Sequence, residues 1–449
     1  MKIILLSGGS GKRLWPLSNE SRSKQFLKVL KNQKNEEYES MIQRVWQQLN
    51  DCDLQKDTLI ATSIEQEKMI NLQIGEDVKK VIEPSRRDTF AAIALSCVYL
   101  YDVENTPLNE NIVIAPVDPF VNLDYFDNLK KLPIVLDESQ SNLALMGVKP
   151  SYPSTKFGYI ETGDKYGDWF KVKSFKEKPN EENAKLLIEN NALWNCGVFC
   201  FKLETIINLL KNKKLPINHK ELEENYELLE NNSFDYAFVE KIDSISVLPF
   251  DGEWKDLGTW ESLSLELKEN KIGKVLSDET TINSHIINEL DIPIITLGVD
   301  DLMIVASPDG ILIADKSKTD QLKNIANKVN VTPMFEERYW GSFKILDIVK
   351  NGHFEVLTKR VRINSGKSIS YQYHELRTEI WTILSGEAEI LIDGSYKLIN
   401  TGDTVMIPPK MKHSIKAISN VEMIEIQQGV INGNDVKRIE KYLGEAIKL

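Results

Sequence analysis

The sequence is poor in cysteine and histidine and has no long apolar run. Its 449 residues include four cysteines and five histidines. The cysteines show no C-x-x-C spacing, and Cys196 and Cys200 are expected in one buried strand, so we expect reduced thiols in a cytoplasmic protein. No run approaches the ~18 apolar residues of a membrane helix. The apolar residues 2–6 are too few for a signal peptide.

A surplus of negative charge limits the partners that the chain can bind. The formal net charge is -12, which argues against a surface for nucleic acid. A small phosphorylated substrate remains compatible, because a single pocket can be basic on an acidic protein. The length favours two or three domains. We therefore expect no nucleic-acid partner and no membrane partner.

A glycine-rich stretch, SGGSGKRLWPLS at residues 7–18, fits neither common phosphate-binding motif. Walker A would need Gly at position 6 and Ser or Thr at position 13, where Leu6 and Arg13 stand. The dinucleotide fingerprint fails at Leu14. Consecutive backbone amides after a strand, with adjacent cations, still favour an anion. A basic surface turn is the alternative, and this stretch alone does not decide between the two.

Three patterns follow one another along the chain. Up to residue 270, strands expected at 2–6, 58–62 and 111–115 alternate with helices expected at 38–49 and 89–100. This alternation is typical of an α/β domain around a buried parallel sheet. Residues 271–330 hold short strands and a helical stretch, and residues 331–449 are all β. We therefore predict three segments: 1–270, 271–330 and 331–449.

Eight motifs follow the loop in the order of a known family. They are SKQFL, EPSRRDTFAAIAL, IVIAPVDPF, KFGYIE, FKEKP, LWNCGVF, FDYAFVEK and WKDLGTW. Together with the loop they span about residues 1–265. The set resembles the sugar-1-phosphate nucleotidylyltransferases, and within them the mannose-1-phosphate guanylyltransferases. The resemblance implies a Rossmann-like domain in which a sugar phosphate oxygen attacks the α-phosphorus of a nucleoside triphosphate.

The resemblance also implies roles at the phosphates. Arg13 and the loop amides would hold the β- and γ-phosphates, and Lys24 would bridge the substrate and the α-phosphate. Asp118 and Asp256 would bind Mg²⁺, a hard cation usually held by carboxylates and phosphates; an isolated Asp is otherwise a cap or turn residue. The residues implied to contact the nucleotide are Gly8, Gly9, Gly11, Lys12, Glu83 and Arg87.

The base and the sugar are assigned by the same resemblance. Glu83 suits the two adjacent donors of guanine, which favours GTP, although Asp88 and Pro119 depart from the family pattern. Lys178 would grip the sugar phosphate. The remaining sugar contacts would come from Gly147, Glu161, Glu177 and Asn195. A surface carboxylate and a capping amide are the alternative roles for Glu177 and Asn195.

The C-terminal segment contains a second pattern. Residues 366–386 and 402–413 fit the cupin motifs G-x₅-H-x-H-x₄-E-x₆-G and G-x₅-P-x₄-H, with glutamine in the first histidine place. The spacing predicts one divalent metal, Zn²⁺ or similar, with mixed nitrogen and oxygen ligands. The predicted ligands are Gln372, His374, Glu379 and His413.

The same segment resembles type II phosphomannose isomerases, which are cupins often fused behind a mannose-1-phosphate guanylyltransferase. Arg377 matches an arginine tied to isomerisation. Leu376 and Ile380 stand where those enzymes commonly carry further histidines, so we expect metal binding with weak or absent isomerisation. The resemblance implies left-handed β-helix turns for residues 271–330.

Together these features predict an enzyme that makes GDP-mannose and pyrophosphate from GTP and mannose 1-phosphate, assembled as a homo-oligomer. One alternative is a nucleotidylyltransferase for another hexose or heptose 1-phosphate with a non-catalytic cupin. The other is a catalytically silent regulatory homologue that binds a nucleotide sugar. The combined presence of Arg13, Lys24, Asp118, Lys178 and Asp256 argues against the silent homologue.

Overall fold

The chain divides into two compact units. The structure is a computed structural model that describes residues 1–9, 12–19, 22–32, 34–329, 332–352, 354–431 and 435–440. The first unit comprises residues 1–14 and 23–268, and the second comprises residues 15–22 and 269–449. The three predicted segments stay a prediction. Gly11 lies outside the described residues, and the side chain of Lys12 is likewise outside the description.

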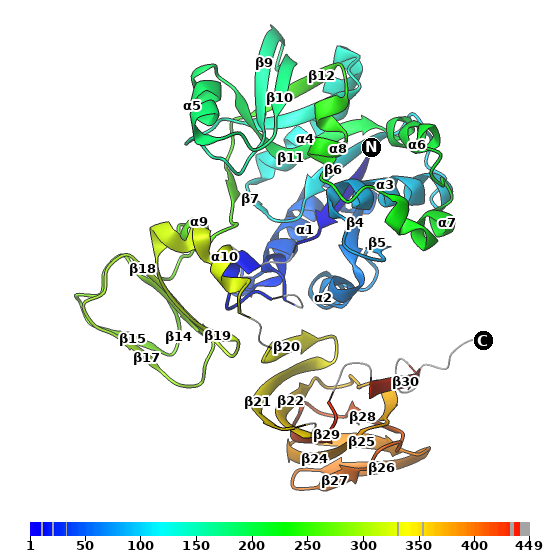
Figure 1. The fold of residues 1–449 in the computed structure, drawn as a ribbon, viewed down its shortest axis with the longest axis vertical. Helices are drawn as coiled ribbons and strands as arrows, with labels where there is room; N and C mark the ends of the chain where they lie inside the picture. The colour runs from blue at the N-terminus through cyan, green and yellow to red at the C-terminus, as the bar shows by residue number, and fades with distance from the viewer. Residues whose placement is uncertain are drawn as a thin grey trace. The chain divides into compact units, whose positions relative to one another are not determined.

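The first unit is built on a sheet of nine described strands (Figure 1). Across the sheet their order is β5 (Lys80–Glu83), β4 (Thr58–Ser63), β1 (Lys2–Ser7), β6 (Asn111–Pro116), β11 (Leu193–Lys202), β8 (Leu143–Val148), β12 (Ile245–Phe250), β10 (Trp169–Lys176) and β9 (Tyr159–Tyr166). Strands β5, β4, β1 and β6 run parallel. Strand β11 runs antiparallel to both β6 and β8, so the sheet is mixed.

The predicted parallel sheet is therefore right for β5, β4, β1 and β6 and for the pair β8–β12, but it is wrong for β11, β10 and β9, which pair antiparallel to their neighbours in this order. Ile3 and Leu5 face one core while Ile4 faces the other, so β1 is a continuous apolar run. Strand β11 is also buried on both faces, with Cys200 in one core and Phe201 in the other. A continuous apolar run indicates that a strand is buried on both faces, but it does not show whether the strand runs parallel or antiparallel to its neighbours. The four cysteines are free and buried, and Cys196 and Cys200 lie in one buried strand, β11, as predicted.

Helices cover both faces of this sheet (Figure 1). Helices α1, α2 and α4 pack into one core, and α3, α6, α7 and α8 pack into the other. Their bounds, with those of the smaller helices of this unit, are α1 (Met41–Asp51), α2 (Ile64–Ile74), α3 (Asp88–Asp102), α4 (Leu123–Ser139), α5 (Glu181–Glu189), α6 (Leu203–Asn212), α7 (His219–Glu224), α8 (Phe234–Ala237) and α9 (Trp260–Ser264). Helix α10 (Leu322–Ala326) belongs to the second unit. Among the described residues, no helix is long and apolar enough to cross a membrane.

The second unit begins with short parallel strands. Strands β14 (Lys271–Gly273), β16 (His285–Asn288) and β18 (Leu302–Ser307) pair side by side in parallel, and β19 (Gly310–Asp315) closes this sheet as an antiparallel edge. Strands β15 (Val275–Ser277) and β17 (Ile294–Thr296) form a parallel pair of their own. Gly273 has a φ of 87°, and a Cβ there would lie 2.0 Å from the carbonyl oxygen of Asn288. Only glycine therefore fits this crossing.

The strands from β20 onward form two sheets (Figure 1). One sheet contains β20 (Phe335–Arg338), β21 (Gly341–Asn351), β22 (Phe354–Ile363), β29 (Val421–Gly429), β24 (Arg377–Ser385) and β27 (Thr404–Ile407). The other contains β26 (Ser395–Asn400), β25 (Glu387–Ile392), β28 (His413–Ala417), β23 (Tyr371–His374) and β30 (Val436–Glu440). Apolar side chains from both sheets, among them Trp381 and Ile415, share one core. This is a cupin-like domain of mostly strands, as expected.

Candidate active site and metal centre

Lys24 lies between two carboxylates in the first unit. It begins a short 3₁₀ helix, Lys24–Phe26, in which the fully buried Phe26 anchors the turn. The ammonium nitrogen is 2.5 Å from Asp118 Oδ2 and 3.3 Å from Asp256 Oδ1. Asp118 directly precedes β7 (Pro119–Val121), and Asp256 ends β13 (Trp254–Asp256). These strands pair with Asp256 opposite Pro119, which brings both carboxylates to one place.

The charges of this cluster favour a bound cation. Burial alone would lower the pKa of Lys24, but the nearby carboxylates of Asp118 and Asp256 raise it overall, so the amine stays charged. Two carboxylates and one ammonium leave one surplus negative charge. Both aspartates remain partly exposed. Oxygen ligands in this arrangement fit Mg²⁺, which is usually bound by one or two carboxylates together with phosphates and waters.

Arg13, the fourth predicted catalytic residue, is exposed. It lies in a 3₁₀ helix, Lys12–Leu14, that comes after β1 and after Gly8 and Gly9, which we call the glycine turn. An exposed guanidinium can reach a phosphate without first leaving a buried partner. Its role stays a prediction.

A cavity of about 380 Å³ opens at the end of β1. Four of the predicted nucleotide-binding residues line it: Gly8, Gly9, Glu83 and Arg87. Its other walls come from the ends of β4 and β5 and from the start of α3. The cavity therefore lies at the carboxyl edge of parallel strands, which is where open α/β sheets bind ligands.

Two contacts fix the far wall of this cavity. The Tyr226 hydroxyl donates to Glu83 Oε2 at 2.8 Å. Burial raises the pKa of Glu83, while the Tyr226 hydrogen bond and Arg86 oppose the rise. Arg87 Nε donates to the carbonyl oxygen of Leu229 at 3.0 Å. Glu83, which was predicted to bind the base, is thus held in place by the Tyr226 hydroxyl.

The predicted sugar-binding residues gather around a buried carboxylate. Glu177 Oε1 lies 2.5 Å from Lys178 Nζ, and Glu177 Oε2 is buried with no hydrogen-bond partner among the described residues. Asn195 Nδ2 donates to Asp235 Oδ1 at 2.7 Å, and its Oδ1 accepts from the Gly197 amide at 3.0 Å. Burial raises the pKa of Asp235 to about 7, with a further rise from Glu177, against the lowering effect of Lys178 and Asn195.

The two remaining sugar residues lie on β8 and β9, which both pair with β11. Gly147 is in β8 directly opposite Asn195 of β11. A Cβ on Gly147 would lie 2.9 Å from the Leu193 side chain, so Leu193 can pack against this backbone only because the residue is glycine. Glu161 is on β9 and accepts a hydrogen bond from Ser174 of β10. Its carboxylate is therefore oriented by the hairpin partner.

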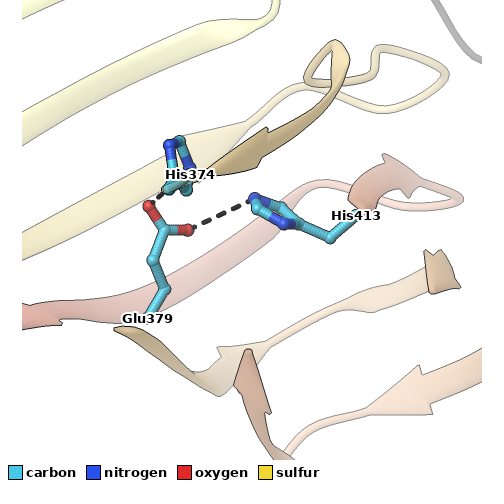
Figure 2. Close-up of side chains that lie close together, drawn as sticks. All are labelled: His374, Glu379 and His413. Atoms are coloured by element: carbon cyan, nitrogen blue, oxygen red, sulfur yellow. Dashed lines mark ion pairs between the residues drawn. The ribbon is translucent and has the colours of Figure 1, made fainter. Parts of the chain in front are cut away.

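In the cupin-like domain the Glu379 carboxylate lies between two histidines (Figure 2). Glu379 Oε1 is 3.0 Å from His374 Nε2, and Oε2 is 3.5 Å from His413 Nε2. All three side chains are at most 2% exposed. They come from β23, β24 and β28, and their ligand atoms lie within 4.8 Å of one another.

These residues fit a divalent transition metal. His413 Nδ1 contacts the Met411 carbonyl oxygen at 2.9 Å, and its buried Nε2 has no hydrogen-bond partner among the described residues. Burial lowers the pKa of His413 more than Glu379 raises it, which favours the neutral ring that binds metals. A tetrahedral ion about 2.1 Å from each ligand atom separates those atoms by about 3.4 Å. The 3.0 and 3.5 Å separations in the structure are close to this value.

Further side chains surround Glu379. Arg377 Nε donates to its Oε1 at 3.1 Å, and Arg377 Nη2 lies 3.2 Å from His374 Nε2. Gln427 donates to Oε1 at 3.0 Å and the Trp381 indole donates to Oε2 at 3.2 Å. Burial alone would raise the pKa of Glu379, but the histidines and Arg377 hold it well below its usual range.

Gln372 is the predicted fourth metal ligand. It pairs with His413 across β23 and β28. Its Oε1 accepts a hydrogen bond from the Ser370 hydroxyl at 3.0 Å. Metal binding by Gln372 stays a prediction.

Comparison with known families decides the relationship of the chain. Residues 2–270 match the family described as "Nucleotidyl transferase". The chain belongs to the nucleotidyl transferase family. Residues 327–441 of this nucleotidyl transferase match a second family, "Mannose-6-phosphate isomerase C-terminal".

Curated relatives match this nucleotidyl transferase over its full length. The mannose-1-phosphate guanylyltransferase of Escherichia coli K12 is 28% identical, and mannose-1-phosphate guanylyltransferase 2 of Escherichia coli O157:H7 is 26% identical; each alignment covers 98% of both chains. A solved structure from Thermus thermophilus, titled as a mannose-1-phosphate geranyltransferase, is 25% identical with a TM-score of 0.62. It covers 73% of this chain and 98% of that chain. The expected resemblance is thus confirmed.

Several residues of this nucleotidyl transferase were missed by sequence reasoning. Gln66 lines the cavity, Tyr226 binds Glu83, Asp235 binds Asn195, and Gln427 binds Glu379. Asp235 stands inside the quoted FDYAFVEK motif, which was a usable signal. The other three are isolated polar residues, and only the fold shows that each side chain reaches a functional group.

Proposed function

We propose that this chain transfers a guanylyl group from GTP to mannose 1-phosphate. A phosphate oxygen of the sugar phosphate attacks the α-phosphorus, the bond to the β-phosphate oxygen breaks, and pyrophosphate leaves. GDP-mannose and pyrophosphate are the products, so atoms and charge balance. The observation that carries the proposal is Lys24 placed between Asp118 and Asp256, in a chain whose full-length relatives are named guanylyltransferases. A cavity lined by Gly8 and Gly9 in the same unit supports it.

Different residues of the chain act on the attacked phosphate and on the leaving pyrophosphate. Lys24 stays charged and neutralises oxygens of the attacked phosphate, and Arg13 with the amides of Gly8 and Gly9 holds the leaving pyrophosphate. Asp118 and Asp256 would hold Mg²⁺, which when bound supplies further charge neutralisation. Such chemistry depends on positioning and on charge more than on covalent catalysis.

At the other end, Lys178 binds the sugar phosphate. Glu177, Asn195 and Glu161 accept or donate hydrogen bonds at the sugar hydroxyls, with Gly147 offering its backbone. Glu177 Oε2 is buried and has no hydrogen-bond partner in the part of the chain that the structure describes. It supports this role, because a buried acceptor without a donor is costly unless a ligand supplies one. For the base, Glu83 would accept from guanine.

Product identification tests the proposal. The purified chain, with GTP, mannose 1-phosphate and Mg²⁺, should form GDP-mannose, detected by mass spectrometry, together with an equal amount of pyrophosphate. Omitting either substrate should abolish both signals. Another hexose or heptose 1-phosphate used in preference to mannose 1-phosphate would favour the alternative nucleotidylyltransferase. Binding of GDP-mannose without turnover of any sugar phosphate would favour the silent homologue.

The cupin-like domain supports a second candidate function. We propose that His374, Glu379, His413 and Gln372 hold one transition metal, Zn²⁺ or similar. When bound, the metal would polarise a sugar carbonyl and hydroxyl for the isomerisation of mannose 6-phosphate. Leu376 is exposed and Ile380 is apolar, so neither supplies a base at that place. Conversion of mannose 6-phosphate to fructose 6-phosphate is therefore expected to be weak or absent.

The finer structural expectations are part of the same proposal. The parallel ladders β14–β16–β18 and β15–β17 support β-helix turns for residues 271–330, and their left-handed coiling is our proposal. The cytoplasmic location and the homo-oligomer stay predictions.

A further inference from the structure

A fully buried amide lies beneath the predicted phosphate site. Gln66 is the third residue of α2, and its side chain is only 1% exposed. Its Nε2 donates to Ser23 Oγ at 2.8 Å and lies 3.4 Å from the carbonyl oxygen of Gly9. A buried amide group must find partners within the protein. Gln66 finds them in two segments that are distant from α2 in the sequence.

The oxygen of the same amide has partners in the same two segments. Gln66 Oε1 accepts from Gln25 Nε2 at 3.1 Å and from Ser7 Oγ at 3.4 Å. Gln25 Nε2 also donates to Ser7 Oγ at 3.3 Å, so the contacts form a closed network. Ser7, Ser23 and Gln25 are themselves at most 2% exposed.

The partners of Gln66 surround the groups that the transfer reaction needs. Ser7 ends β1 and Gly9 belongs to the glycine turn that lines the cavity. Ser23 and Gln25 are the direct neighbours of Lys24 in the chain. One side chain thus ties the phosphate-binding turn to the lysine that faces Asp118 and Asp256.

We propose that Gln66 is a positioning residue that sets the glycine turn relative to Lys24. It touches no reacting atom and acts through Gly9 and through the neighbours of Lys24. The inference rests on the proposed guanylyl transfer. A misplacement of about 1 Å at such a site can cost about 100-fold in rate. Removing the amide also leaves Ser7, Ser23 and Gln25 short of partners in a buried place.

The test compares two glutamines of α2 in the full chain. Gln66→Leu removes the amide at similar volume. Gln73→Leu is the control for the contact with the glycine turn. The Gln73 amide also makes hydrogen bonds, to the carbonyl oxygen of Phe26 at the end of the Lys24 helix and from Ser40, but none of its described contacts reaches the glycine turn. We expect kcat to fall about 10–100-fold in Gln66→Leu, with the KM for mannose 1-phosphate nearly unchanged. Gln73→Leu should keep kcat within about threefold of wild type, at a comparable loss of thermal stability.

A second readout does not depend on turnover. Trypsin cleaves after Lys12, Arg13 and Lys24, and we expect faster cleavage at these sites in Gln66→Leu than in Gln73→Leu. If Gln66→Leu does not fold, Gln66→Glu replaces it: the carboxylate keeps the shape but cannot donate to the Gly9 carbonyl, so the same loss of kcat and the same faster cleavage are expected.

Several outcomes overturn the inference. One is wild-type kcat in the Gln66 variants; another is an equal loss of kcat in both glutamine variants; a third is unchanged cleavage at Lys12, Arg13 and Lys24. Absence of turnover in the wild-type chain would instead overturn the proposed function. The cleavage comparison would then still decide whether Gln66 orders the glycine turn.

Discussion

Asp256→Asn is the substitution that separates catalysis from folding most cleanly at the Lys24 cluster. Asp256 Oδ1 is 3.3 Å from Lys24 Nζ, whereas Asp118 Oδ2 is closer, at 2.5 Å. Lys24 therefore keeps its stronger partner in the variant. Strands β7 and β13 pair through backbone groups, so the amide does not disturb them. Because Asp256 is also partly exposed, we expect the free energy of unfolding to change by less than about 1 kcal/mol.

The expected loss of activity is much larger. The cluster of two carboxylates and one ammonium has one surplus negative charge, and the substitution removes it. The substitution also removes one of the two carboxylates that are proposed to hold Mg²⁺. Loss of a single electrostatic stabiliser at a phosphoryl- or acyl-transfer site costs about 100-fold or more in kcat, or roughly 3–4 kcal/mol of barrier.

The assay is pyrophosphate release at saturating GTP, mannose 1-phosphate and Mg²⁺. Glu253→Gln serves as the matched control, because Glu253 lies just before β13, is 43% exposed and pairs only with Lys255 among the contacts described. It should retain wild-type turnover. If Asp256→Asn also retained wild-type turnover, Asp256 would play no part in catalysis and the proposed metal site would be wrong.

Three further predictions follow from other parts of the chain. Arg13→Ala should weaken GTP binding far more than mannose 1-phosphate binding in calorimetric titrations; loss of affinity for the sugar phosphate alone would reverse the orientation of the loop. Wild-type protein should contain about one transition metal per chain by elemental analysis, and His374→Ala should lose it. A metal-free wild type would contradict the metal site and would mean that these side chains only pack inside the barrel. Burial raises the pKa of Asp235 to about 7, above its unfolded value, so the folded state binds the extra proton and the free energy of unfolding should fall as pH rises from about 4 to about 7. Asp235→Asn should flatten that pH dependence in denaturant titrations, and an unchanged slope would contradict the assignment.

Local patterns predicted the elements better than their pairing. The strands at 2–6, 58–62 and 111–115 and the helix at 89–100 are present with nearly the expected bounds. The helix expected from Tyr38 begins only at Met41, because Ser40 and Gln43 form a capping box and residues 38–39 pair as a strand. Strand direction was not predictable for β11, since burial on both faces erases the alternation of polar and apolar residues.

The candidate site could be predicted where the sequence motif itself includes the functional side chains. Asp118 and Asp256 meet because β7 and β13 pair, and the two histidines and Glu379 meet because three strands enter one core. Gln66 carries no such signal, because its importance comes from where α2 places a single amide. Contacts between segments that are distant in the sequence can be identified only once the fold is known.

The measurement that tests the central claim most directly is the initial rate of pyrophosphate release across a matrix of nucleoside triphosphates and sugar 1-phosphates. GTP, ATP, CTP and UTP would each be combined with mannose 1-phosphate, glucose 1-phosphate and a heptose 1-phosphate at saturating Mg²⁺. We predict that GTP with mannose 1-phosphate gives the highest kcat/KM of the matrix. A higher value for another pair would contradict the assigned substrates, and no release from any pair would contradict catalysis by this chain.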